Sequence, residues 1–144
     1  MLPALNEEGE LPPGVHAATL ADIEWRFGSG TDARVSAMDT LKHLHELALR
    51  TGSLKAFYVF GSFVSAAPSP RDIDLALVMD ADFRLEDCPR EAQTLFSHAD
   101  AQARFRASVF WLREGTLGEH AMREFFAAWQ TKRDGSVRGI LEVA

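Results

Sequence analysis

The sequence predicts an α/β domain in which a small mixed sheet is flanked by helices. The run 55–60 is rich in aromatic and β-branched residues and has the composition of a buried strand, and the run 72–79 is a second predicted strand. Segments with apolar residues at helical spacing precede and follow them. The resulting order of helix, strand, strand, helix, strand, helix is typical of an α/β or α+β domain. With 144 residues, we expect one domain over 1–144 that begins with an extended arm over 1–19.

The first elements follow from turn and capping residues. The run Leu11-Pro12-Pro13-Gly14 cannot be helical, which makes the segment before it an extended arm. A short helix is expected over 20–27. Thr31 or Asp32 then caps a longer helix, which Gly52 ends. The apolar stripe expected on that helix consists of Val35, Met38, Leu41, Leu44 and Ala48.

The two central strands are separated by a short turn. One helical turn is expected over 63–67, stopped by Pro68 and Pro70. In the strand 72–79 alternate residues point to opposite faces. One face carries Ile73, Leu75, Leu77 and Met79, and the other carries Asp72, Asp74, Ala76 and Val78.

The remaining elements are a helix over 90–103, a strand over 105–112, a helix over 117–129 and a short strand within 137–143. Residues 133–136 have the composition of a turn. Most aromatic residues of these elements are expected in the core. They are Phe57, Tyr58, Phe60, Phe110, Trp111, Phe125, Phe126 and Trp129.

Composition narrows the classes of function. The net charge of −6 argues against extended nucleic-acid binding, because the basic clusters, Lys132-Arg133 and Arg104 with Arg106, are short. No stretch is long and apolar enough to span a bilayer, and the acidic start is unlike a signal peptide. The single cysteine, Cys88, fits a reducing cytosol. We therefore expect a cytoplasmic protein.

Two neighbouring motifs carry the expected chemistry. Asp72 and Asp74 are two apart in a strand and project side by side, so they favour a divalent cation such as Mg²⁺ or Mn²⁺. Gly61 at a strand end lets a phosphate approach the backbone, and the Ser62 hydroxyl can donate a hydrogen bond to it. A metal held between carboxylates and a triphosphate is the centre of nucleotidyl transfer.

These motifs resemble the signature of the nucleotidyltransferase superfamily with the DNA polymerase β-like fold. Phe60-Gly61-Ser62 matches its hydrophobic-Gly-Gly/Ser element, and Asp72-Ile73-Asp74-Leu75 matches its Asp-x-Asp/Glu element. The whole chain is similar to small bacterial nucleotidyltransferase-like proteins and to minimal, antitoxin-type members. That wider similarity is carried by Leu11-Pro12-Pro13-Gly14-Val15-His16, Gly61-Ser62-Phe63-Val64, Pro70-Arg71-Asp72-Ile73-Asp74, Arg133-Asp134-Gly135 and Gly139-Ile140.

The resemblance implies a role for each matching residue. Gly61 and Ser62 would hold the β- and γ-phosphates of a nucleoside triphosphate, and Asp72 and Asp74 would ligate two Mg²⁺ ions. A third carboxylate on a neighbouring strand would complete the site. Beside these, Arg71 either neutralises phosphate charge or is an exposed turn residue. Lys132 and Arg133 either bind substrate phosphate or belong to a solvated turn, and we favour the solvated turn.

The chain departs from the family pattern at the third carboxylate. The strand 105–112 contains no Asp or Glu, and Ser108 occupies the matching position. Glu114 and Asp100 could replace it only with an unusual backbone path. No HExxH motif is present. We expect structural roles for the five histidines, His16, His43, His45, His98 and His120.

Two functions follow and stay open at this point. The first is a Mg²⁺-dependent nucleotidyltransferase that moves a nucleoside monophosphate from a triphosphate onto an acceptor hydroxyl. The acceptor would be a protein side chain, as in toxin–antitoxin systems, or a small molecule; the acidic surface argues mildly against an RNA end. The second is a degenerate binding module that binds nucleotide or a toxin-like protein partner without chemistry.

Overall fold

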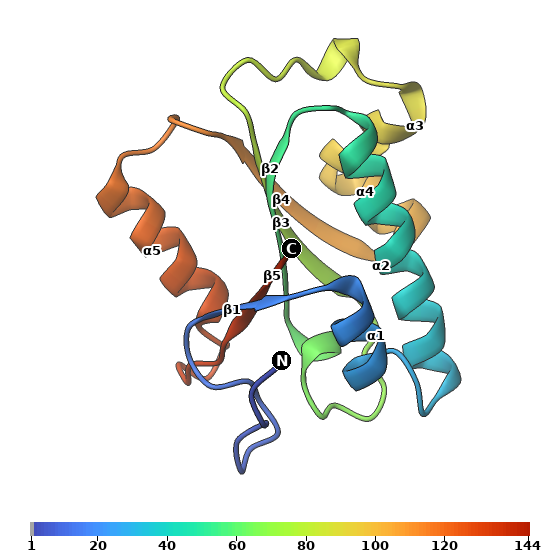
Figure 1. Ribbon diagram of the computed structural model, residues 1–144, viewed down its shortest axis with the longest axis vertical. Helices are drawn as coiled ribbons and strands as arrows, with labels where there is room; N and C mark the ends of the chain where they lie inside the picture. Colours follow the sequence, from blue (N-terminus) through green and yellow to red (C-terminus); the bar gives the residue numbers. More distant parts are fainter. Residues whose placement is uncertain (1) are drawn as a thin grey trace.

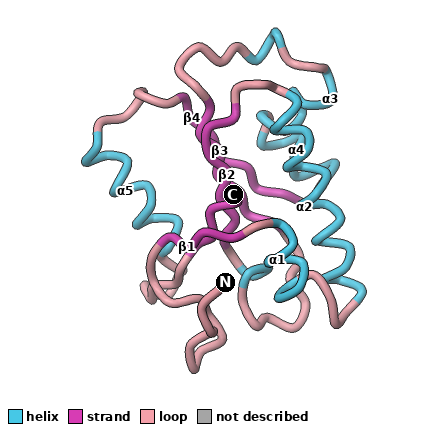
Figure 2. The backbone as a smooth tube through the Cα atoms, in the orientation of Figure 1, coloured by secondary structure: helices cyan, strands magenta, loops and turns pink. Residues whose placement is uncertain are grey.

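The computed structural model describes residues 2–144 and contains a mixed five-stranded sheet with helices on both faces (Figures 1 and 2). The strands lie in the order β1-β5-β2-β3-β4. Antiparallel pairing joins β2 to β3 and to β5, whereas β1 pairs with β5, and β3 with β4, in parallel. Their bounds are Val15–Ala18 (β1), Leu54–Phe60 (β2), Ile73–Met79 (β3), Ala107–Arg113 (β4) and Ile140–Val143 (β5). The predicted fold class, a small mixed sheet flanked by helices, is confirmed.

The helices cover the two faces of the sheet unequally. On one face lie α1 (Leu20–Phe27), α2 (Asp32–Arg50), α3 (Arg90–Gln93) and α4 (His98–Phe105). Among residues 2–144, α5 (Glu119–Gln130) is the one helix on the other face, drawn apart on the left of Figure 1. The larger hydrophobic core therefore lies between the sheet and α1 to α4.

The alternation predicted for β3 is confirmed. Ile73, Leu75, Leu77 and Met79 are buried in the large core. On the other face, Ala76 and Val78 belong to a smaller cluster under α5 that includes Trp129. Asp74 shares that second face, because residues two apart in a strand point the same way.

Local capping explains where α1 and α2 begin. The Thr19 side chain accepts a hydrogen bond from the backbone N–H of Asp22, whose side chain accepts from the Thr19 N–H in return. Thr31 caps α2 by accepting from the N–H of Arg34. Both helices were predicted, but Val35 is 47% exposed and does not belong to the buried stripe of α2.

The helix predicted over 90–103 is wrong in one respect, because it is interrupted. Ser97 has an extended backbone, and its side chain caps α4 by accepting from the N–H of Asp100. Ser competes with the helix for local backbone hydrogen bonds and favours such a cap. Two strand boundaries also shift. Strand β3 begins at Ile73, and β4 begins at Ala107, after Arg106 in a left-handed conformation.

The N-terminal arm is more ordered than its composition suggests. Val15–Ala18 pairs with the last strand, and Leu2 and Leu11 are buried. Gly139 permits this, because a Cβ there would lie 2.0 Å from the carbonyl oxygen of Pro12. Both ends of the chain therefore meet at one edge of the sheet.

Two aromatic residues expected in the core are exposed. Phe110 on β4 is 46% exposed and Phe125 on α5 is 42% exposed. Both face the side of the sheet that α5 covers incompletely. Across residues 2–144, no helix combines the length and apolar character that crossing a membrane requires.

Two leucines of α2, one buried and one exposed, allow the contribution of core packing to stability to be measured. Leu44 is fully buried, whereas Leu49 is 55% exposed. We expect Leu44→Ala to lower the free energy of unfolding by about 2–5 kcal/mol, because it leaves a cavity in the large core. Leu49→Ala should change it by less than about 0.5 kcal/mol. Urea unfolding of both variants checks this, and equal losses would contradict the packing described here.

Candidate functional site

The structure brings residues from two distant parts of the chain around one open cavity of about 510 Å³. Ser62 follows β2, and Asp74 lies on β3. The other lining residues come from the segment between α5 and β5. They are Lys132, Arg133, Asp134 and Arg138. The cavity therefore has carboxylate and hydroxyl groups on the sheet side and three cationic side chains on the C-terminal segment.

Gly61 and Asp74 are in close contact at this cavity. Asp74 pairs with Phe60 across the antiparallel strands, so its side chain reaches the residue after Phe60. Gly61 has a φ of 85°, and a Cβ there would lie 2.1 Å from Oδ2 of Asp74. Any other residue at position 61 would thus be strained and would displace the carboxylate. The glycine predicted to admit a phosphate also makes room for the acid.

The surroundings of Asp74 raise the pKa of its carboxyl. Burial raises the pKa of its carboxyl above the ordinary 3.8; the positive charge of Arg138 lowers this pKa, and the nearby Asp72 carboxylate raises it. Asp72 itself is exposed, just before β3. The two carboxylates are thus electrostatically coupled, as their spacing predicts, but they differ in exposure.

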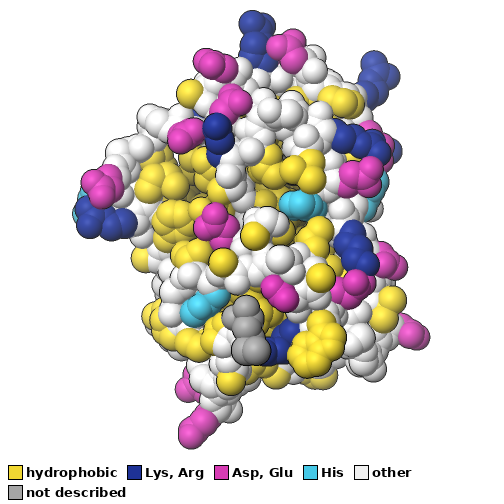
Figure 3. Space-filling model, viewed as in Figure 1, with side chains coloured by type: hydrophobic (Ala, Val, Ile, Leu, Met, Phe, Trp, Pro, Cys, Tyr) yellow, Lys and Arg dark blue, Asp and Glu magenta, His cyan; other side chains and the backbone are white. Residues whose placement is uncertain are grey.

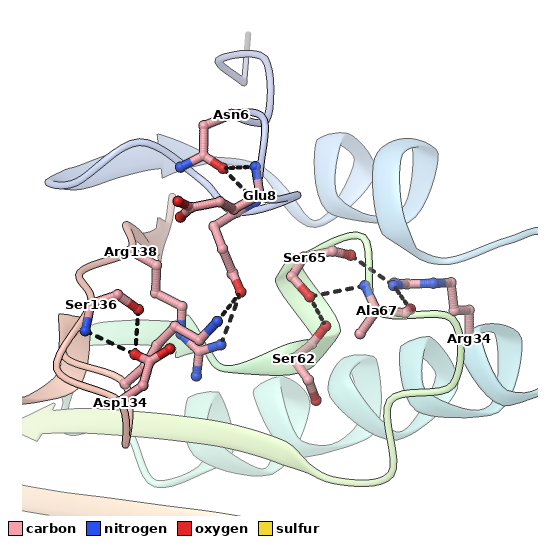
Figure 4. Close-up of polar contacts among 11 residues, drawn as sticks. Asn6, Glu8, Arg34, Ser62, Ser65, Ala67, Asp134, Ser136 and Arg138 are labelled. Atoms are coloured by element: carbon pink, nitrogen blue, oxygen red, sulfur yellow. Dashed lines mark hydrogen bonds and ion pairs between the residues drawn. The ribbon is translucent and has the colours of Figure 1, made fainter.

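The loop after Gly61 is held by a buried arginine that the sequence analysis missed. Arg34 of α2 is 9% exposed. Its guanidinium donates hydrogen bonds of 2.5 to 3.2 Å to the carbonyl oxygens of Phe27, Phe63, Ser65 and Ala67. Figure 4 shows Arg34 reaching this loop. Its position four residues before Met38, on the buried side of α2, is the signal that could have identified it.

The cationic side of the cavity is fixed by a buried glutamate of the N-terminal arm. Glu10 is 7% exposed, and its Oε1 accepts a hydrogen bond from Nζ of Lys132 at 2.9 Å. The same oxygen lies 3.6 Å from Nη1 of Arg138. Asn6 orders this part of the arm, because its side chain accepts from the N–H groups of Glu8 and Glu10 (Figure 4). The arm thus positions two of the three cations.

Two polar atoms in this cluster lack partners. Among the described residues, Oε2 of Glu10 and Nε of Arg138 are buried without a hydrogen bond.

The turn that carries the cations is closed by Asp134, whose Oδ1 accepts from the N–H and hydroxyl of Ser136. These bonds lower the pKa of the Asp134 carboxyl. Asp134 therefore stays ionised at the rim of the cavity.

Ser108 lies at the position where the sequence resemblance implies a third carboxylate. Ser108 lies opposite Asp74 in the parallel pairing of β3 with β4, and its Oγ accepts a hydrogen bond from Nε2 of Gln102 at 2.7 Å. Glu114 follows the far end of β4, where its N–H donates to the carbonyl of Met79. Asp100 lies in the first turn of α4. Within residues 2–144 no three Asp, Glu, His or Cys residues are grouped closely enough to hold a metal.

Arg71, which immediately precedes Asp72, is not among the residues that line the cavity with Ser62 and Asp74. It lines a separate cavity of about 190 Å³ together with residues of α2 such as Ser36 and Thr40. Lys132 and Arg133, for which we favour a solvated turn, lie at the turn before β5, and Arg133 is exposed there. Both residues also line the open cavity with Ser62 and Asp74. Their approach to Asp74 depends on the path of the C-terminal segment, which local sequence does not specify.

Comparison with known proteins gives one family and one distant structural neighbour. Residues 3–144 match the model of a family described as "Family of unknown function (DUF6932)". No curated protein matches the chain. A crystal structure of a "putative nucleotidyltransferase" from Sulfolobus solfataricus is similar, with 19% sequence identity and a TM-score of 0.39. The similarity covers 76% of this chain and 96% of that one.

Removing Arg34 should loosen the loop that carries Ser62. We expect Arg34→Ala to lower the free energy of unfolding by about 3 kcal/mol or more, since four carbonyl oxygens, three of them in buried contacts, lose a charged donor. Arg50→Ala, on the same helix and paired only with exposed Glu46 and Glu91, should cost less than about 1 kcal/mol. Urea unfolding measures both, and a loss for Arg34→Ala no larger than for Arg50→Ala would refute the role described.

The raised pKa of Asp74 makes stability depend on pH in a defined direction. The folded chain keeps this proton at pH values at which the unfolded chain, with an ordinary pKa near 3.8, has lost it. Ionisation of Asp74 therefore costs stability as pH rises above about 4. Asp74→Asn should be more stable than the native chain at pH 7, and the difference should vanish near pH 3. Unfolding midpoints measured over this pH range test the sign.

Proposed function

The chain belongs to the DUF6932 family, whose function is unknown, and we propose that it binds a nucleoside triphosphate with Mg²⁺ and transfers its nucleotidyl group to an acceptor hydroxyl. One observation carries this proposal. Ser62 and Asp74, from the two signature motifs, line one cavity together with Lys132, Arg133 and Arg138. The cavity thus combines groups that bind phosphate with a carboxylate that suits a metal.

The cationic side supports binding of the terminal phosphates. Lys132, Arg133 and Arg138 can donate charge-assisted hydrogen bonds to phosphate oxygens. Ser62 can add a hydroxyl donor from the opposite side of the cavity. Because Glu10 already orients Lys132 and Arg138, the binding of an anion has to order fewer side chains. The unpartnered Nε of Arg138 is a further donor within this cluster.

The acidic side suits a Mg²⁺ ion only in the presence of substrate. Asp72 and Asp74 offer two carboxylates, with the cation Arg138 near Asp74. Mg²⁺ commonly takes one or two protein carboxylates and completes its shell with phosphate oxygens and water. The donor set therefore fits a metal that arrives with a triphosphate, with Mn²⁺ as a substitute. When bound, the ion would neutralise charge that develops on the phosphate oxygens.

The transfer step is an in-line displacement at the α-phosphorus. The acceptor oxygen forms a bond to this phosphorus, the bond to the bridging α–β oxygen breaks, and pyrophosphate leaves with that oxygen. The hydroxyl proton passes to solvent or to a basic group of the acceptor. Lys132, Arg133 and Arg138 would stabilise the charge on the departing pyrophosphate. The acceptor, either a protein side chain as in toxin–antitoxin systems or a small molecule, stays a prediction.

Ser108 favours a second candidate function, nucleotide binding without transfer. Its hydroxyl is engaged by Gln102 at the position where the resemblance implies a third acid. A neutral group cannot act there as an anionic metal ligand or as a base. Phosphate and one metal ion can still bind without it. Such a module would report nucleotide to a protein partner, which also stays a prediction.

The decisive experiment separates nucleotide binding from transfer. ATP, GTP, CTP and UTP are titrated into the chain by calorimetry with and without Mg²⁺, and transfer is followed with α-labelled triphosphates. We expect binding that requires Mg²⁺ and weakens by at least about tenfold in Asp72→Asn/Asp74→Asn. Asp74→Asn should abolish transfer, whereas Asp39→Asn, an exposed substitution on α2, should retain both activities.

The outcomes distinguish the two candidates. Label transferred by the native chain but not by Asp74→Asn supports the transferase. Mg²⁺-dependent binding without any label transferred supports the binding module. If none of the four triphosphates binds, both candidates are wrong.

A further inference from the structure

A second, mostly apolar cavity of about 640 Å³ lies between α5 and β4. Its walls include Phe110 of β4 and two residues of α5, Phe125 and Trp129. Figure 3 shows hydrophobic side chains gathered between α5 and the sheet. Two of its rings, Phe110 and Phe125, are nearly half exposed, so this groove offers aromatic surface to a ligand.

Aromatic contacts connect this groove to the Ser62–Asp74 cavity. Phe60, which immediately precedes Gly61 and pairs with Asp74, lies 6.3 Å from Phe110 between ring centroids. It also stacks on Trp129 at 6.0 Å, and Trp129 lies 5.8 Å from Phe125. One continuous set of rings therefore leads from the carboxylate of the site into the groove.

The strand order places the groove on the side of Asp74 away from the cations. Arg138 precedes β5, Ser62 follows β2, Asp74 lies on β3, and Phe110 lies on β4. Ala76 pairs with Phe110 two residues after the pair of Asp74 with Ser108, so both pairs share one face. A triphosphate with its terminal phosphates at Arg138 and Ser62, and its α-phosphate at Asp74, would direct its nucleoside toward β4.

We propose that the groove binds the nucleobase of the triphosphate, with Phe110 and Phe125 as the aromatic surfaces on which the base stacks. This proposal rests on the proposed function. Planar bases stack on aromatic side chains in a way that tolerates differences in sequence or base identity. His98 and Thr116 also line the groove and supply groups that can hydrogen-bond to the edge of a base. The sites for phosphate and base would then lie on one face of the sheet.

The test compares a nucleotide with the same phosphates lacking a base. Mg²⁺-ATP and Mg²⁺-tripolyphosphate are titrated by calorimetry into the native chain, Phe110→Ala, Phe125→Ala and Phe110→Leu. We expect each of the three substitutions to weaken ATP about tenfold or more and to leave tripolyphosphate unchanged. Trp25→Ala removes an 83% exposed ring on α1 and should change neither affinity. Circular dichroism and thermal unfolding verify that the variants are folded.

Several results would overturn the proposal. One is unchanged ATP affinity in folded Phe110→Leu and Phe125→Ala. Another is tripolyphosphate binding as tight as ATP in the native chain, which would leave the phosphate site standing without a base site. Loss of transfer with normal ATP binding would assign the groove to the acceptor, and a native dimer that Phe110→Ala dissociates would assign it to a second copy. If neither ATP nor tripolyphosphate binds, the proposed function itself fails.

Discussion

The contact between Gly61 and Asp74 is the constraint on which the site depends. The carboxylate of Asp74 occupies the space that a side chain at position 61 would fill. This arrangement requires β2 to end at Phe60, opposite Asp74, and requires a positive φ at the next residue. The strand register, the direction of the loop after it and the burial of the acid are therefore set together. A shift of one residue in the pairing would turn Asp74 toward the large core.

Two buried charges, Arg34 and Glu10, hold the rest of the site in place. Arg34 ties the loop to the helical face through backbone carbonyl oxygens. Glu10 joins the N-terminal arm to Lys132 and Arg138, which precede the last strand. Buried charges of this kind are costly unless they are paired. The site is thus completed only when both ends of the chain have packed against the central strands.

Local motifs predict the acidic half of the site, whereas the cationic half depends on tertiary structure. One strand determines the relative position of Asp72 and Asp74, and one turn requires the glycine at position 61. Both features therefore depend on local backbone geometry. The approach of Lys132 to Ser62 instead depends on the path of residues 131–138 and on Glu10, more than a hundred residues away. The interruption at Ser97 has a different cause. Apolar spacing continues across this residue, whereas its extended backbone and the capping bond to Asp100 separate the two helical segments.

The overall charge of the chain is a poor guide to this cavity. A net charge of −6 argues against a long basic surface for nucleic acid. Around the cavity, however, three cationic side chains, Lys132, Arg133 and Arg138, face two carboxylates, Asp74 and Asp134. Because burial raises the pKa of Asp74 even with Arg138 nearby, its negative charge is costly, and a metal ion beside it would reduce that cost. An anionic ligand that brings its own Mg²⁺ would satisfy both halves of the cavity at once, whereas a bare anion or a bare metal ion would satisfy only one. This local charge distribution is the physical reason to expect a metal-bound triphosphate, rather than a nucleic-acid strand, at this site.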